Sequence, residues 1–148
     1  MATRFQQFCN EVGDALEGVK LDHNNMDYKM MPDANTGLIA RLTVGEIPFL
    51  FTVEPDDELR NYSVGCVCEL PDGYDQNTDE INTANCEING VKFQYNKEDN
   101  VIFIIVDFFR PFVDNDNYLL ESIEVGIGRI LDALETAGAK GYLSIFSD

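Results

Sequence analysis

The chain is poor in the residues that usually build catalytic and metal centres. Its 148 residues include one histidine, His23, and four cysteines, Cys9, Cys66, Cys68 and Cys86. His23 stands in a polar stretch with no serine or cysteine near it in sequence, so we interpret it as a solvated loop residue. Cys66 and Cys68 would share one face of a strand, without a second pair or a nearby histidine. We therefore expect core thiols rather than a metal site.

Basic residues are also scarce. Ten lysines and arginines stand against 27 aspartates and glutamates, which gives a net charge of −17. Such a field repels phosphate backbones and anionic membrane surfaces, so we expect neither direct nucleic-acid binding nor membrane binding. The acidity is compatible with an ordinary solvated surface, with a protein that handles sticky or basic partners, and with a mimic of a polyanion.

Long apolar segments are absent. The first residues contain no apolar core of a secretory signal, and no segment approaches the ~20 apolar residues that cross a bilayer. The cysteines are sparse for this length, which fits free thiols in a reducing compartment. We therefore predict a cytoplasmic protein. The length and the 45% hydrophobic content predict a single domain over residues 1–148 with its own core.

What dominates the chain is the apolar run Val101–Phe109. Its β-branched and aromatic composition predicts a strand, and Asp107 is its only charged residue. A strand that is apolar on both faces usually lies inside a sheet with something packed on each side. A buried Asp107 would need a partner, Arg110 or Arg41, or a raised pKa. An ion pair or a strand end that reaches solvent is favoured over a catalytic carboxylate.

Hydrophobic periodicity and turn residues place the remaining elements. Thr3 can cap the first helix, Gly45 suits a two-residue hairpin turn, and Asn100 suits a left-handed loop position. Helices are predicted over 3–20, 78–87 and 118–137, and strands over 28–31, 38–44, 47–53, 62–70, 91–95 and 101–109. The order helix, strands, helix, hairpin, helix predicts an α+β fold, with an antiparallel sheet of about five to six strands and helices mainly on one face. The tail 142–146 is apolar enough to dock as a short strand or helix.

Two acidic stretches imitate cation sites. The spacing Asp75-x-Asn77-x-Asp79 resembles the opening of a calcium loop, but Glu80 stands where glycine is needed and Cys86 replaces the last carboxylate. We interpret this stretch, and likewise Asp114 and Asp116, as helix-capping loops. No glycine-rich phosphate loop or nucleophile elbow is present. We therefore predict no metal, no cofactor and no enzymatic activity.

The closing helix carries a flank of small residues beside its apolar stripe. Gly126 and Gly128 each cost roughly 1 kcal/mol against alanine inside a helix, so packing is expected to compensate them. The flank either meets a second copy of the chain or lets the helix sit close on its own sheet. A homodimer is the favoured alternative. The hypothetical partner or dimer surface consists of Phe109, Phe112, Ser122, Gly126, Ala133 and Ala137.

The second half of the chain resembles a known family. The run Ile81-Asn82-x-x-Asn85, then Gly90-x-Lys92-Phe93, a polar turn, a hydrophobic strand and a long closing helix resemble YbjN-type bacterial proteins. These proteins share a fold with the class I chaperones of type III secretion. The resemblance covers about residues 81–137, and element order, size and acidity are similar over the whole chain. It implies a dimer that wraps an extended segment of another protein around apolar patches, or a regulatory role.

These observations support three functional hypotheses. The first is a non-enzymatic, chaperone-like or regulatory module that binds another protein or an extended peptide segment. The second is an acidic inhibitor that mimics nucleic acid and acts on a nucleic-acid-binding protein. The third is an enzyme built around Asp107, which a structure without a pocket beside that residue would exclude.

Overall fold

The computed structural model of the protein describes residues 3–23, 25–55, 59, 61–73, 78–109 and 118–146. Six antiparallel strands form one sheet in the order β1-β2-β3-β4-β6-β5. The strands are β1 Met26–Met30, β2 Leu38–Val44, β3 Ile47–Val53, β4 Asn61–Glu69, β5 Lys92–Asn96 and β6 Val101–Phe109. The predicted α+β class and the antiparallel sheet are thereby confirmed.

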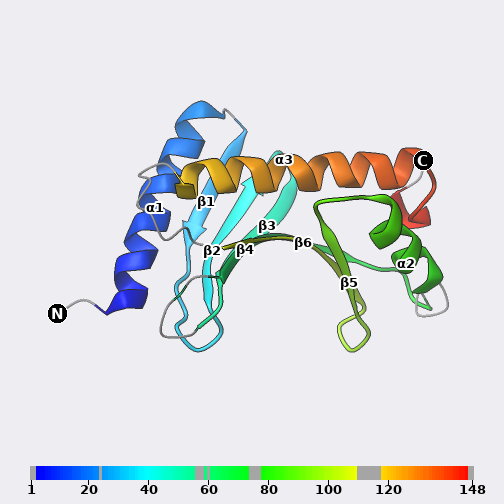
Figure 1. Cartoon of the computed structure of the whole chain (residues 1–148), viewed down its shortest axis with the longest axis horizontal. Coiled ribbons are helices and arrows are strands. Elements are labelled where there is room, and N and C mark those ends of the chain that lie inside the picture. The colour runs from blue at the N-terminus through cyan, green and yellow to red at the C-terminus, as the bar shows by residue number, and fades with distance from the viewer. Residues whose placement is uncertain are drawn as a thin grey trace.

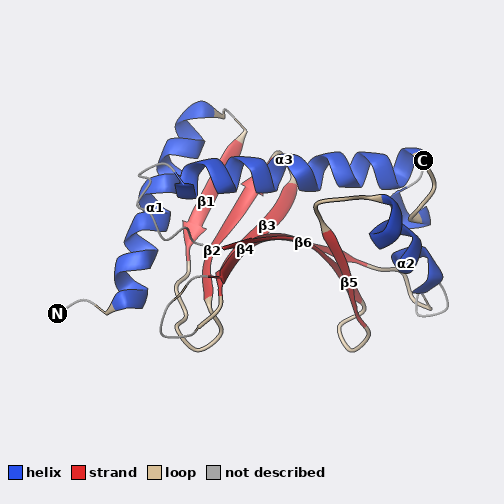
Figure 2. Ribbon diagram, viewed as in Figure 1, coloured by secondary structure: helices blue, strands red, loops and turns tan. Residues whose placement is uncertain are grey.

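The helices gather on one side of this sheet. They are α1 Arg4–Asp22, α2 Thr78–Glu87 and α3 Tyr118–Ala139, with a short 3-10 helix η2 at Ser144–Phe146. Figure 1 shows α3 running along the sheet, with α1 at the β1 side and α2 beyond β5. Figure 2 shows that none of the described helices covers the opposite face. In the same view the sheet descends on either side of β4 and β6, so that it arches beneath α3.

The core lies between the sheet and the helices α1 and α3, because the strands β3, β4 and β6 alternate their buried residues. The even positions of β6 from Ile102 to Val106 are buried, and so are Tyr62, Val64 and Cys66 of β4. Tyr62 stacks between Phe51 and Phe108 with ring centroids 5.6 and 5.5 Å apart. Alternating burial of this kind is what a sheet with one covered face requires.

Local chemistry sets the ends of several elements as predicted. Thr3 caps α1 in a capping box with Gln6, since each side chain accepts a hydrogen bond from the other residue's backbone N–H. Gly45 has φ +62° in the two-residue β2–β3 turn. Asn100 has φ 51°, and its side-chain amide donates to the Leu70 carbonyl at 2.9 Å. That bond ties the β5–β6 turn to the end of β4.

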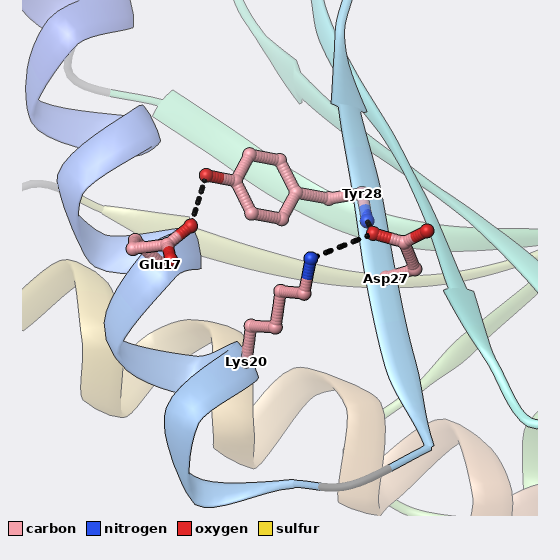
Figure 3. A network of polar contacts seen from close by, with 4 residues as sticks. All are labelled: Glu17, Lys20, Asp27 and Tyr28. Atoms are coloured by element: carbon pink, nitrogen blue, oxygen red, sulfur yellow. Dashed lines mark hydrogen bonds and ion pairs between the residues drawn. The ribbon is translucent and has the colours of Figure 1, made fainter.

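A polar network joins α1 to the edge strand β1 (Figure 3). Lys20 Nζ lies 3.2 Å from Asp27 Oδ1 and 5.9 Å from the centroid of the Tyr28 ring. The Tyr28 hydroxyl donates to Glu17 Oε2 at 2.7 Å, and the Tyr28 backbone N–H donates to Asp27 Oδ1 at 2.9 Å. These exposed contacts link the last turns of α1 to β1.

The structure differs from expectation at the C-terminal end of α3, which was predicted to end at residue 137. The helix continues through Gly138 to Ala139, and a Cβ at position 138 would collide with the backbone of Phe146. Gly138 therefore allows the close approach of η2 rather than ending the helix. The tail docks as predicted, since it forms a 3-10 helix and Leu143 is fully buried. None of the described helices has the length and apolar character needed to span a membrane.

Candidate functional site

A hollow of about 580 Å³ opens on the face of the sheet that the described helices leave uncovered. Residues of β3, β4, β5 and β6 and of the β5–β6 turn line it. The apolar ones are Leu50, Val67, Phe103 and Ile105, each half-buried. Strand β6 lies inside the sheet as predicted, but the expectation of cover on both faces is wrong for the described residues. Its odd positions are left as apolar surface.

Gly65 forms the floor of this hollow. It pairs with Leu50 on one side and with Ile105 on the other, so a position between two apolar side chains carries none of its own. A Cβ there would lie 3.5 Å from Ile105 Cγ1, which is ordinary contact. A side chain would therefore fit at position 65, and the hollow exists because glycine has none.

Polar groups border the apolar floor. The hydroxyls of Thr52 and Ser63 are 2.7 Å apart, so each satisfies the other across β3 and β4. Lys97 and Glu98 of the β5–β6 turn stand at the rim. An apolar floor with a small number of polar groups at its edge is the usual composition of a protein ligand site.

Asp107 lies at the edge of this face and is exposed. Its Oδ2 is 3.6 Å from Lys92 Nζ, and the two side chains are 66% and 56% exposed. A pair this exposed contributes little stability. The expected partner Arg41 is not the one found, and Arg110 lies outside the described residues. Of the two alternatives predicted for this residue, an ion pair or a strand end that reaches solvent, the structure shows the ion pair. A smaller hollow includes Asp107 with Thr52 and Ser63, so the condition set for excluding an enzyme is not met.

Cys66 and Cys68 lie on the covered face with their sulfurs 3.8 Å apart. Both are free thiols, Cys66 buried and Cys68 half-buried. The contact with Cys68, together with burial, raises the pKa of the Cys66 thiol. The same contact lowers the pKa of Cys68, because the thiol of Cys66 can donate a hydrogen bond to the Cys68 thiolate. In the described residues no three histidine, cysteine or acidic side chains come together as a metal site would require.

Three of the residues assigned to a dimer surface face the interior of the chain itself. Gly126, Ala133 and Ala137 are buried within the chain itself, and a Cβ on Gly126 would lie 3.0 Å from Val64 Cβ. This is the arrangement of the second alternative, in which α3 sits close on its own sheet. Ser122 donates to the Tyr118 carbonyl at 2.7 Å, and its Oγ lies 2.8 Å from the Tyr62 hydroxyl. Phe109 is 56% exposed at the end of β6, and Phe112 lies outside the described residues.

The other residues considered from the sequence are at the surface or outside the described residues. His23 is exposed and its backbone N–H closes the C-terminal end of α1 on the Lys20 carbonyl. Asp79 is exposed in the first turn of α2. The remaining positions of the two acidic stretches, Asp75, Asn77, Asp114 and Asp116, lie outside the described residues.

Sequence reasoning missed the hollow itself. The apolar odd positions of β6 were recognised, but they were expected to be covered. The available signal was the number of long amphipathic segments. Only residues 3–20 and 118–137 were long enough to cover a face, and both could lie on the same one.

No protein family model and no curated protein matches the sequence. Among solved structures, a chain in the crystal structure of the ExsC–ExsE complex is similar in fold. The two are 8% identical, the match covers 88% of this chain and 90% of that chain, and the TM-score is 0.49. Similarity at this level does not establish a common function. The YbjN-type family resemblance therefore stays a prediction.

Proposed function

We propose that the protein is a binding protein without catalytic activity, which holds an extended segment of another protein on the uncovered face of its sheet. The observation that supports this role is the row of half-buried apolar side chains around Gly65. Leu50, Val67, Phe103 and Ile105 present apolar surface in a hollow that can take side chains of a partner. Exposed apolar surface bordered by polar groups is typical of protein-interaction sites.

The expected partner segment is apolar with basic flanks. The apolar side chains would enter the hollow, and the net charge of −17 would attract basic residues on either side. A chaperone-like role, in which the segment is kept extended until it is released, fits these features. So does a regulatory role in which the bound segment is masked from other partners.

Site-specific photo-crosslinking tests the proposal. We expect a benzoylphenylalanine at position 103 to cross-link a partner in the source cell, and the same probe at Leu21, which is 78% exposed on α1, to cross-link none. Gly65→Leu would fill the hollow and abolish the cross-link. Val125→Leu, at a 44% exposed position of α3, would leave it intact. Equal cross-linking from positions 103 and 21 would refute the proposal.

The charge alone favours a second candidate, an acidic inhibitor that occupies the nucleic-acid site of another protein. The captured partner separates the two roles. A nucleic-acid-binding protein that duplex DNA displaces from the complex at constant ionic strength supports mimicry. A partner that DNA does not displace, and that is bound through one extended segment, supports the first proposal.

A further inference from the structure

A second cavity lies on the helix-covered side, where the end of α1, the start of β1, the end of β2 and the middle of α3 meet. It encloses about 270 Å³. Its walls are apolar and are formed by Val19, Met26, Val44, Ile127 and Leu131. His23 and Asn25, both exposed, stand at its mouth. A space of this size accommodates a side chain or a small molecule rather than a folded element.

Glu124 of α3 also lines this cavity and is poorly satisfied by the chain. Its Oε1 atom is shielded from solvent and accepts no hydrogen bond from the described residues. No lysine or arginine is among the described residues that line the cavity. Lys20, on the same turn of α1 as Val19, points to Asp27 instead (Figure 3). A shielded carboxylate oxygen without a donor is unfavourable, so a cation brought in from outside would find an uncompensated partner.

Gly128 is a second, independent indication that the space beside Glu124 is left open for a ligand. It lines the cavity one helical turn after Glu124, on the same face of α3. A Cβ at Gly128 would meet nothing within 4 Å, whereas a Cβ at Gly126 would crowd Val64. Glycine is unfavourable inside a helix, so its presence needs a reason. Packing within the chain supplies that reason for the glycine at position 126 but not for the glycine at position 128. The missing side chain keeps the space beside Glu124 open.

We propose that this cavity binds an ammonium or guanidinium group carried on a short apolar stem. The stem would pack against the apolar walls, and the cation would pair with the Glu124 carboxylate. The terminal torsion of a glutamate is soft, so a small turn brings a carboxylate oxygen to the cavity. The net charge of −17 raises the local concentration of cations. This inference does not depend on the role proposed for the uncovered face, which lies on the other side of the sheet.

Titration calorimetry with a matched pair of probes tests the proposal. The n-pentylammonium ion and n-pentanol share one stem and differ in charge. We expect pentylammonium to bind at least ~10-fold more tightly than pentanol. Glu124→Gln should weaken pentylammonium by ~10-fold or more and leave pentanol unchanged. Glu121→Gln, at an exposed position of the same helix, removes the same charge and should leave both affinities unchanged.

A second variant and a second probe complete the test. Gly128→Leu should occupy the cavity and abolish binding of both small molecules, which keeps the proposal testable if Glu124→Gln does not fold. A blocked Ala-Lys-Ala peptide that binds as pentylammonium does identifies the natural ligand as a basic side chain of a partner. Binding of the free amine alone identifies a small cationic metabolite. Equal affinity for pentylammonium and pentanol, equal effects of the two glutamine variants, or no binding at all would overturn the proposal.

Discussion

At the scale of single residues, the contact between α1 and β1 includes two ionisable side chains whose pKa values shift in opposite directions (Figure 3). The backbone N–H of Tyr28, followed by Lys20, lowers the pKa of Asp27 below its usual 3.8. The hydrogen bond to Glu17, followed by burial and nearby acidic charges, raises the pKa of Tyr28 above its usual 10.0. The charged form of Asp27 and the neutral form of Tyr28 are therefore the stabilised ones.

The direction of each pKa shift predicts the pH range in which each contact contributes to the free energy of unfolding. The Asp27 contribution is present above about pH 4 and is lost as the pH falls through its folded-state pKa. The Tyr28 contribution is present below about pH 10 and is lost as the pH rises through its folded-state pKa. Urea unfolding should be measured across pH. The free energies of unfolding of the wild type and Asp27→Asn should become equal only in acid. Those of the wild type and Tyr28→Phe should become equal only in alkali. Curves that stay parallel at both extremes would contradict this prediction.

The thiol pair of β4 gives a second residue-scale prediction. The thiol of Cys66 can donate to the thiolate of Cys68, which lowers the pKa of Cys68, while the same contact and burial raise the pKa of Cys66. Iodoacetamide should therefore alkylate Cys68 before Cys66 in the folded protein. Cys66→Ala removes the donor and should move alkylation of Cys68 to higher pH, as peptide mass spectrometry can measure. The exposed Cys86 is the internal reference, and an unchanged pH profile of Cys68 would show that the contact has no such effect.

At the scale of elements, the two glycines of α3 have different physical causes. A Cβ at position 126 would lie 3.0 Å from Val64 and 3.4 Å from Phe108. Gly126→Leu should therefore lower the free energy of unfolding by about 1–3 kcal/mol. Gly128 faces open space, so Gly128→Leu should raise it by about 0.5–1 kcal/mol through helix propensity. Urea unfolding of both variants compares one substitution at neighbouring positions of one helix. Equal destabilisation by both would show that the helix backbone, and not the sheet beneath it, sets the cost.

Element positions were largely predictable. The bounds of β2, β3, α2 and β6 coincide with the predicted ranges, and α1 and β4 differ by at most two residues at an end. These segments carry their own signal, because alternation and turn residues act within a few positions. The role of Gly126 was left open between a second copy and the chain's own sheet. The sequence of a helix shows that one side carries small residues, but it does not show which surface packs against that side.

At the scale of the whole molecule, a twofold dimer stays a prediction. Phe109, at 56% exposure, offers surface for it, whereas Gly126, Ala133 and Ala137 do not. Light scattering at tens of micromolar should give about twice the chain mass of 16.7 kDa for the wild type, and Phe109→Asp should give the chain mass. Val125→Asp, at a 44% exposed position of α3, should leave the mass unchanged. A wild-type mass near 16.7 kDa would contradict the dimer.

The sequence by itself determined most of the elements, the antiparallel pairing through hairpins, and the net charge of −17. Each of these follows from local periodicity, turn chemistry or composition. Only the tertiary structure decided that no described helix covers the second face of β6, which leaves Phe103 and Ile105 around the hollow at Gly65. It also placed Glu124 and Gly128 beside Val19 and Val44 in the second cavity. Both sites join residues far apart in the chain, and which surfaces meet depends on long-range packing that no segment encodes alone.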